Sequence, residues 1–208
     1  MPRTAPAPAV SAAHAELDRQ LAQLVAAGVP GLTGIGPTAL LRRVAPLYEL
    51  LAEECSQTFL LVVPGLAPLD RLVSLTSLNG RPGFTTMEPD DLARFGPTGD
   101  VEIPDRAYLL LDPDTGPDSL DVPPEKALPG LLAAGRTPLT LDEGLALLLV
   151  RGGELLRRET CFSMLASRCG DRRVPALWVS KGAPRLGWCW DGAPHTWLGS
   201  ASAAARLG

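Results

Sequence analysis

Short apolar segments separated by glycine and proline are the feature that most restricts the fold of this chain. Its 208 residues include 21 Gly and 21 Pro, about a fifth of the total and below the roughly 25–30% typical of low-complexity sequences. Because glycine and proline enforce turns, the sequence predicts short elements joined by many loops. Apolar residues make up 46% of the chain and charged residues 20%, a balance that excludes a disordered protein.

Helical patterns open the chain and return after its middle. Residues 14–27 place leucines on one helical face, and Pro37 is well placed to begin a second helix. A further helix is expected over residues 124–134. Another should start at Thr140, because Thr140 and Glu143 have the spacing of a capping box ahead of an apolar run.

Strand patterns lie between and after these helices. Residues 58–65 and 108–111 are short apolar runs typical of buried strands, and Asn79-Gly80 is a strong signal for a β-hairpin. Since strands and helices do not alternate regularly, a parallel doubly wound sheet is not expected. We therefore predict an α+β domain, with N-terminal helices packed on a mixed, mainly antiparallel sheet that includes a Trp-rich C-terminal hairpin.

The C-terminal hairpin over residues 173–190 can be placed in register. If residues 181–184 form a four-residue loop, Ser180 pairs with Arg185 and opposed residue numbers sum to 365. Both faces are then mainly apolar, so the hairpin is expected to be central and covered on two sides. Large aromatic side chains dominate core burial, and three tryptophans are accordingly expected in the core: Trp178, Trp188 and Trp190.

Charge and hydropathy exclude several classes of partner and location. A formal net charge of −4 gives no electrostatic basis for general binding of nucleic acid or anionic membranes. The longest apolar run, residues 145–150, is far shorter than the ~18 residues of a membrane span. Residues 1–13 lack the apolar stretch of a signal peptide, and we expect a disordered tail there, followed by a single cytoplasmic domain over residues 14–208.

The cysteines do not follow a metal-binding pattern. In a reducing compartment the four cysteines are expected as free thiols, ligands or nucleophiles rather than disulfides. Cys161, Cys169, Cys189 and His195 are chemically suitable zinc ligands, but their C-x7-C-x19-C-x5-H spacing contains no closely spaced cysteine pair to form half of the site. We therefore predict no metal and no cofactor.

Cys169 is the candidate nucleophile. It lies in the segment SRCGDRR, beside arginines whose charge would stabilise a thiolate. His195 is the candidate base, and Asp171 or Asp191 would orient its ring. These residues define one functional hypothesis, a cysteine-dependent hydrolase or acyl transferase with Cys169, His195 and Asp171 as its catalytic set.

Charge asymmetry supports a second and preferred hypothesis. The formal net charge of residues 151–185 is +5, whereas that of residues 88–121 is −8. Such a distribution indicates either acidic and basic faces that meet within the molecule or two surfaces for different partners. Arginines bind carboxylates and phosphates bidentately, and the predicted anion-binding residues are Arg168, Arg172 and Arg173. The preferred function is a non-catalytic binding protein for an anionic small molecule or an acidic protein segment.

Several blocks of the sequence resemble a known family. They are VVPGLAPLDR, RPGFTTMEPDDLARF, AYLLLDPDTG, GRTPLTLDEG, SRCGDRRVPALWVSKGAPRLGWCW and PHTWLGSAS. Together they resemble an uncharacterised actinobacterial family, a domain of unknown function, over roughly residues 14–206. The resemblance implies a single-domain actinobacterial protein, and it assigns no activity, ligand or catalytic residue.

Overall fold

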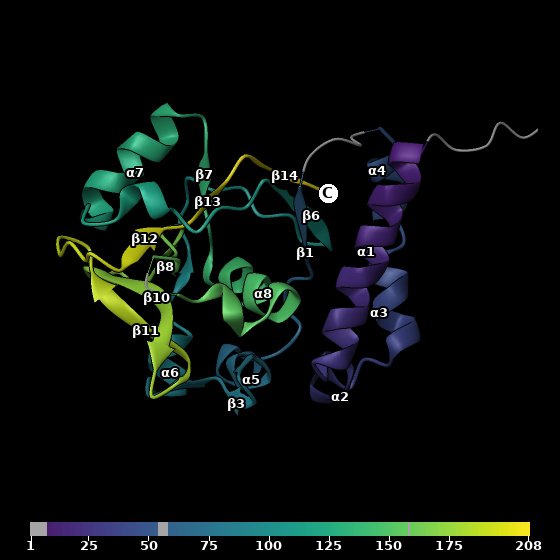
Figure 1. Ribbon diagram of the computed structural model, residues 1–208, viewed down its shortest axis with the longest axis horizontal. Helices are drawn as coiled ribbons and strands as arrows, with labels where there is room; N and C mark the ends of the chain where they lie inside the picture. The colour runs from purple at the N-terminus through teal and green to yellow at the C-terminus, as the bar shows by residue number, and fades with distance from the viewer. Residues whose placement is uncertain (1–7, 54–57, 158) are drawn as a thin grey trace, which may run out of the picture.

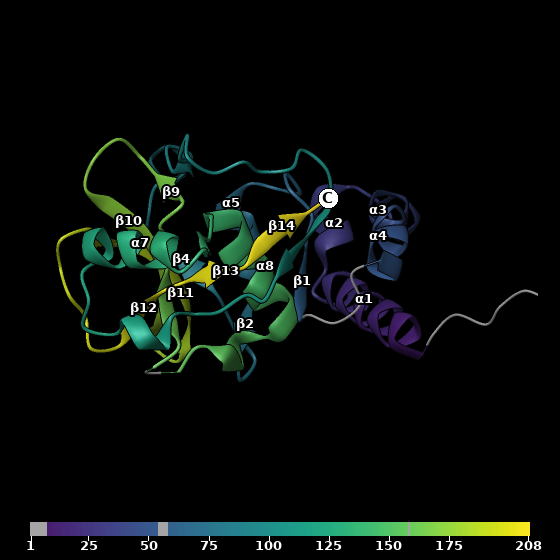
Figure 2. The same ribbon diagram turned by 90° about the horizontal axis from the view of Figure 1, so that it is seen from above.

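The chain adopts an α+β fold in a computed structural model that describes residues 8–53, 58–157 and 159–208 (Figure 1). Four helices come first and lie together at one side of the molecule (Figures 1 and 2). They are α1 (Pro8–Ala26), α2 (Val29–Thr33), α3 (Pro37–Val44) and α4 (Leu47–Glu53). The mixed helix and strand composition confirms the predicted fold class.

The remaining elements are mostly short, as the many glycines and prolines predict. The later helices are α5 (Leu69–Leu75), α6 (Pro89–Leu92), α7 (Pro124–Ala133) and α8 (Leu141–Arg151), with 3-10 turns η1 (Pro117–Ser119) and η2 (Gly153–Leu155). The strands are β1 (Phe59–Val62), β2 (Ser77–Leu78), β3 (Arg81–Pro82), β4 (Phe84–Thr85), β5 (Gly96–Pro97), β6 (Tyr108–Leu111), β7 (Thr137–Pro138), β8 (Cys161–Ser163), β9 (Ser167–Arg168), β10 (Arg173–Ser180), β11 (Ala183–Trp190), β12 (Leu198–Ser200), β13 (Ser202–Ala203) and β14 (Ala205–Leu207).

Two sheets organise the strands. The first is antiparallel, in the order β1-β6-β14. The second has the order β12-β8-β10-β11-β4, with antiparallel pairs at its centre and parallel pairs at both edges. Helix α8 packs against strands of both sheets and is buried along most of its length, as expected for a helix that is apolar on nearly all sides. In the part of the chain that the structure describes, no helix is long and apolar enough to cross a membrane.

Local sequence signals located most of the elements. The Asn79-Gly80 hairpin joins β2 and β3, and the reciprocal hydrogen bonds of the Thr140–Glu143 capping box are both present. Helix α1 begins at Pro8, six residues before the expected start of ordered structure, and the rest of the predicted tail, residues 1–7, lies outside the described residues.

The predicted register of the C-terminal hairpin is wrong by two residues. Ser180 pairs with Ala183 instead of Arg185, because Lys181 and Gly182 form a two-residue turn with positive φ values of 53° and 75°. A turn of this kind matches the twist of the strands better than a longer loop. Side chains alternate with a period of two, so this shift leaves every side chain on its predicted face.

The expectation that the hairpin tryptophans are core residues is wrong for Trp188 and Trp190. Trp178 is half-buried, whereas Trp188 and Trp190 are 36% and 53% exposed. The last two rings pack on each other edge to face, with centroids 4.9 Å apart. The face that carries them is therefore not covered at this end of the hairpin, and their apolar surface is only partly removed from water.

A buried charged cluster connects α8 with the first sheet. Glu143, in the first turn of α8, is fully buried. Its Oε1 accepts hydrogen bonds from the Tyr108 hydroxyl at 2.7 Å and from Arg206 Nε at 2.6 Å. Its Oε2 accepts from Arg206 Nη2 at 2.8 Å and from the Thr140 backbone N–H at 2.7 Å. Burial, followed by the adjacent Glu143 charge, holds the pKa of Tyr108 well above its ordinary value.

Replacing one member of this ion pair should destabilise the protein strongly. Arg206→Met leaves the Glu143 carboxylate buried without its cation, and we expect unfolding by urea to show a loss of about 3–5 kcal/mol. The double variant Glu143→Leu with Arg206→Met should recover much of that loss, because neither charge then remains buried. Arg172→Met, at a largely exposed ion pair, is the control. A loss for Arg206→Met no larger than that of the control would contradict the assignment.

Candidate functional site

Arg173 is held between two carboxylates. Its Nη1 and Nη2 donate to the carboxylate of Asp91 at 2.6 and 2.8 Å, and its Nε donates to Asp171 Oδ2 at 2.9 Å. These hydrogen bonds raise the pKa of Arg173 above its ordinary value. The guanidinium carbon also lies 5.5 and 5.6 Å from the ring centroids of Phe95 and Trp188. The charge of this predicted anion-binding residue is therefore compensated within the molecule.

The other two predicted anion-binding arginines also face carboxylates. Arg168 Nη2 lies 3.2 Å from Asp191 Oδ1, and Arg172 Nη2 lies 2.7 Å from Glu125 Oε2. All three predicted arginines thus have an acidic partner in this chain. Of these ion pairs, only Arg173–Asp91 joins the basic segment 151–185 to the acidic segment 88–121, and that contact fits the interpretation in which the two segments meet within the molecule.

Cys169 and Asp171 lie together, but in an arrangement that disfavours the thiolate. The Cys169 thiol donates to Asp171 Oδ1 over 3.0 Å. Burial and this hydrogen bond raise the pKa of the Cys169 thiol, while the same bond and those from Arg173 lower the pKa of Asp171 to about 2. A nucleophilic cysteine needs a lowered pKa, so this environment keeps Cys169 protonated near neutral pH.

His195 is placed beside an aromatic ring. Its centroid lies 5.2 Å from that of Trp197, and its Nε2 is buried without a hydrogen-bond partner among the described residues. Asp191, the alternative residue for orienting the ring, is paired with Arg168. The hydrogen bonds that the structure records for Cys169 and Asp171 therefore do not include His195.

The strand register separates two of the four candidate zinc ligands. Cys189 pairs with Val174 near the start of β10. Cys161 is on β8, where the next residue, Phe162, pairs with Leu177 of β10. Cys161 therefore lies beside the other half of β10, four positions along that strand from Val174. Four positions along a strand correspond to about 13 Å, which is too far for ligation of one ion. Within the described ranges, no group of three metal-ligating side chains gathers, and burial raises the pKa of Cys189 to about 12.

Cys169 should react slowly with alkylating reagents. Because the thiolate is the reactive species and the pKa of the Cys169 thiol is raised by burial and its bond to Asp171, we expect iodoacetamide to modify Cys169 more slowly than a free cysteine near neutral pH, with a rate that increases as the pH rises. Mass spectrometry of tryptic peptides over time measures this rate, and the same reaction in urea is the control. Fast modification of Cys169 in the folded protein would instead support the cysteine-dependent hydrolase.

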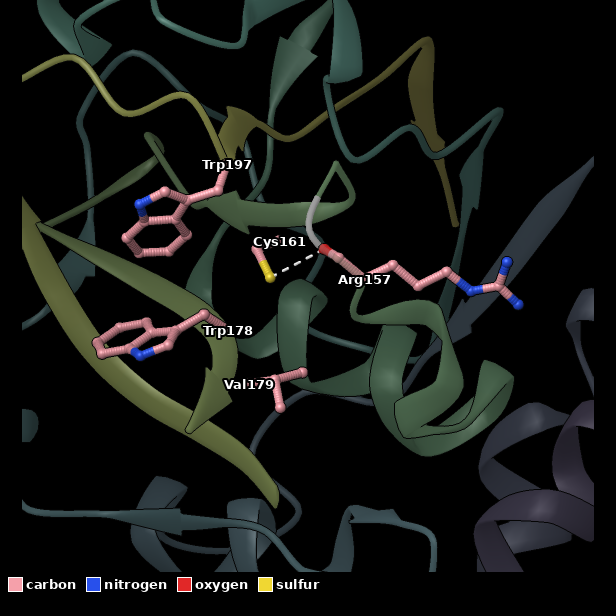
Figure 3. A pocket seen from close by; sticks show the side chains of 5 residues that line it. All are labelled: Arg157, Cys161, Trp178, Val179 and Trp197. Carbon is pink, nitrogen blue, oxygen red and sulfur yellow. Dashed lines mark hydrogen bonds between the residues drawn. The ribbon is translucent and has the colours of Figure 1, made fainter. Parts of the chain in front are cut away.

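A cavity beside two tryptophans is the candidate binding site with the most aromatic lining. It has a volume of about 390 Å³ and is lined by Trp178, Trp197, Cys161, Val179 and Arg157. The two indole centroids are 6.2 Å apart and their planes are inclined by 60°. Figure 3 shows both rings extending to the same side, with the Cys161 sulfur set between the points where they leave the backbone. The Cys161 thiol donates to the Arg157 carbonyl over 3.1 Å, and the Arg157 side chain points away from the indoles (Figure 3).

Close packing on a glycine sets the position of Trp178. A Cβ atom at Gly187 would lie 2.3 Å from the Trp178 ring, so the indole rests directly on the backbone of β11. Trp197 immediately precedes β12, which pairs with β8 and so stands beside Cys161. The sequence argument missed this cavity because it assigned the tryptophans to the core. Gly187 within a strand was the available signal, since glycine there indicates close approach of another group.

Gly187→Ala should displace Trp178. The added methyl group overlaps the indole ring, and such overpacking typically costs about 1–3 kcal/mol. We expect a lower melting temperature together with a shift in the tryptophan emission maximum. Gly130→Ala, on α7 with open space around the new methyl group, is the matched control: it should leave the emission maximum unchanged and, because alanine favours a helix over glycine, should not lower the melting temperature. Equal behaviour of the two variants would show that Trp178 does not rest on Gly187.

The fold and the cavity define an α+β protein with a hollow of small-molecule size between two indole rings. The chain matches the model of the Family of unknown function (DUF5701) over residues 23–208, and it belongs to that family. The resemblance to an uncharacterised family is thereby confirmed. No curated protein and no solved structure matches the chain.

Proposed function

We propose that this protein is a non-catalytic binding protein for a small anionic molecule with a planar ring, held between Trp178 and Trp197. The observation that carries the proposal is the cavity of about 390 Å³ between these side chains. Ligand pockets of drug-sized molecules typically measure roughly 300–1,000 Å³ and are lined mainly by apolar and aromatic groups. The cavity satisfies both criteria.

The inclination of the two indoles favours a planar ring over a flexible chain. Aromatic rings prefer offset-stacked or edge-to-face contacts with centroids about 4.5–7 Å apart. Two faces inclined by 60° form a V-shaped cleft, in which a ligand ring stacks on one indole and meets the other at an angle. Cys161 and Val179 close the cleft from behind with apolar surface.

One group near the cleft supports an anionic substituent on the ligand. Arg157 lines the cavity and is exposed, and no ion pair involves it among the described residues. Its side chain points away from the indoles in Figure 3, and the proposal requires a rotation that brings the guanidinium over the opening. The anion is assigned to the rim of the cleft, because Arg168, Arg172 and Arg173 already face carboxylates.

The thiols near these residues support binding over covalent catalysis. Burial raises the pKa of the Cys161 thiol, which lines the cleft, and the pKa of Cys169 is raised as well. Both environments favour the unreactive thiol form. The hydrolase alternative, with Cys169, His195 and Asp171, therefore has less support than the binding function.

A cytoplasmic location and an actinobacterial origin belong to the same proposal. Cys161, Cys169 and Cys189 are free thiols, a state that persists in reducing compartments. Lys126 and Lys181 are the only lysines, so 17 of the 19 basic residues are arginines. This bias, with the abundance of Gly and Pro, is typical of coding by a GC-rich genome.

Isothermal titration calorimetry with defined probes tests the function. Indole-3-acetate carries a planar ring and a carboxylate, indole-3-acetamide has the ring without the charge, and acetate has the charge without the ring. We expect indole-3-acetate to bind with a measurable heat and raise the melting temperature, the amide to bind about tenfold more weakly, and acetate to have no effect. Arg157→Gln should abolish the preference for the acid over the amide, since hydrogen bonds to charged groups contribute about 1.5–3 kcal/mol.

Matched variants separate the cleft from other surfaces. Trp197→Leu removes one wall of the cleft and should weaken both ring probes, whereas Arg42→Gln, on α3, should leave them unchanged. The absence of a binding heat and an unaltered melting temperature with all three probes would contradict the proposal. Binding that survives Trp197→Leu unchanged would place the ligand elsewhere.

A further inference from the structure

Arg185 lies between two aromatic rings on one face of the second sheet. Phe84 of β4 and Trp178 of β10 are its direct neighbours in the strand register, and side chains at opposed positions share a face. The guanidinium carbon is 5.9 Å from the centroid of the Phe84 ring and 5.2 Å from that of Trp178. Its Nη2 donates to the Thr86 hydroxyl at 3.0 Å. Two rings and one hydrogen bond therefore hold the guanidinium in place.

Arg185 is half-buried without a counter-ion. It forms no ion pair with a described residue, and its Nε is buried without a hydrogen-bond partner in the same part of the chain. Charges removed from water are costly unless they are paired, and cation–π contacts recover only part of that cost. The other half-buried arginines that the structure describes each meet a carboxylate: Arg136, Arg168, Arg173 and Arg206. The exception at Arg185 indicates an external anion.

The hollow beside Arg185 also contains an unpaired carboxylate. It has a volume of about 540 Å³, and its lining includes Arg185, Glu88 and Asp91. Asp91 binds Arg173, whereas Glu88 is exposed and forms no ion pair with any residue in the described ranges. Arg185 and Glu88 thus carry opposite charges and line one hollow, but they do not pair with each other.

Most of the remaining lining is apolar. Apart from Thr86, it consists of Met87, Gly187, Trp178 and Trp188. Trp188 is 36% exposed, so a ligand that covers its ring removes apolar surface from water. The volume lies within the roughly 300–1,000 Å³ of small-molecule sites. The hollow therefore fits a small ligand that combines an anionic, a cationic and an apolar group.

We propose that this hollow binds a free α-amino acid with an apolar side chain. The ligand carboxylate lies against the Arg185 guanidinium, its ammonium group faces Glu88, and its side chain packs on Trp178 and Trp188. A phosphate monoester, with a charge of about −1.5 to −2, fits less well because Glu88 would repel it.

The hollow and the cleft are neighbours, because Trp178 lines both. The amino-acid site does not rest on the proposed function, since Arg185 and Glu88 are not part of the cleft lining. Ligands without a planar ring, and variants at positions other than Trp178, keep the two tests separate.

Isothermal titration calorimetry with three matched compounds tests the site. L-leucine carries both charges, 4-methylpentanoate lacks the ammonium group, and 3-methylbutylamine lacks the carboxylate. We expect L-leucine to bind with a measurable heat and each analogue to bind about tenfold more weakly, because each loses one hydrogen-bonded charge.

Variants of the two charged residues assign each preference. Arg185→Gln should no longer distinguish L-leucine from 3-methylbutylamine, and Glu88→Gln should no longer distinguish L-leucine from 4-methylpentanoate. The matched controls are Arg157→Gln, in the cleft, and Asp90→Asn, which is exposed and outside the hollow; both should keep the two preferences. Circular dichroism checks that each variant is folded, and the exposed position of Glu88 makes its variant informative even if Arg185→Gln is unstable.

Three outcomes would overturn the proposal. The first is the absence of a binding heat with L-leucine. The second is equal binding of L-leucine and either analogue to the native protein, which would show that one of the charges is not recognised. The third is L-leucine binding that survives Arg185→Gln but is lost in Trp197→Leu, which would place the amino acid in the cleft.

Discussion

The buried ion pair between Glu143 and Arg206 is the interaction on which the arrangement of the sheets depends. It joins the first turn of α8 to the last strand of the chain, and the Tyr108 hydroxyl links the same carboxylate to β6. Charges removed from water cost several kcal/mol unless they are paired and hydrogen-bonded, so these elements must assemble together. Strands β12, β13 and β14 follow one another and enter three different sheets. Anchoring Arg206 therefore also fixes the segment that carries Trp197 to the cleft.

A side chain closes the free edge of the first sheet. At the free edge of β1, the buried side chain of Gln20 takes the place of a neighbouring strand: its Nε2 donates to the Phe59 carbonyl at 2.9 Å, and its Oε1 accepts from the Leu61 N–H at 2.6 Å. Helix α1, which carries Gln20, thus closes that edge. Unpaired edges attract other strands unless they are protected, so this contact also protects the first sheet from pairing with another chain.

Charge compensation within the molecule changes where an anion can bind. The arginines that stand out in the sequence have acidic partners in the fold, among them Arg173 with Asp91 from the strongly acidic segment. At these arginines an external anion would compete with carboxylates that are already in place. The cleft between Trp178 and Trp197 involves no such competition, because its rings present apolar surface and Arg157, which lines it, is exposed and forms no ion pair with a described residue. The binding function that charge asymmetry suggested is thereby better supported at a different place.

The sequence by itself determined the elements whose signals are local. The capping box at Thr140, the Asn79-Gly80 turn and the alternation of side chains along the C-terminal hairpin each depend on residues within a few positions of one another. Lysine is not a residue that favours positive φ, so the turn at Lys181-Gly182, and with it the register, carried no clear signal. Only the tertiary structure decided which tryptophans are exposed, which carboxylate each arginine meets and where the cleft forms. These properties depend on contacts between residues far apart in the chain; Gly187 within a strand indicated the close approach of another group, but not which group approaches.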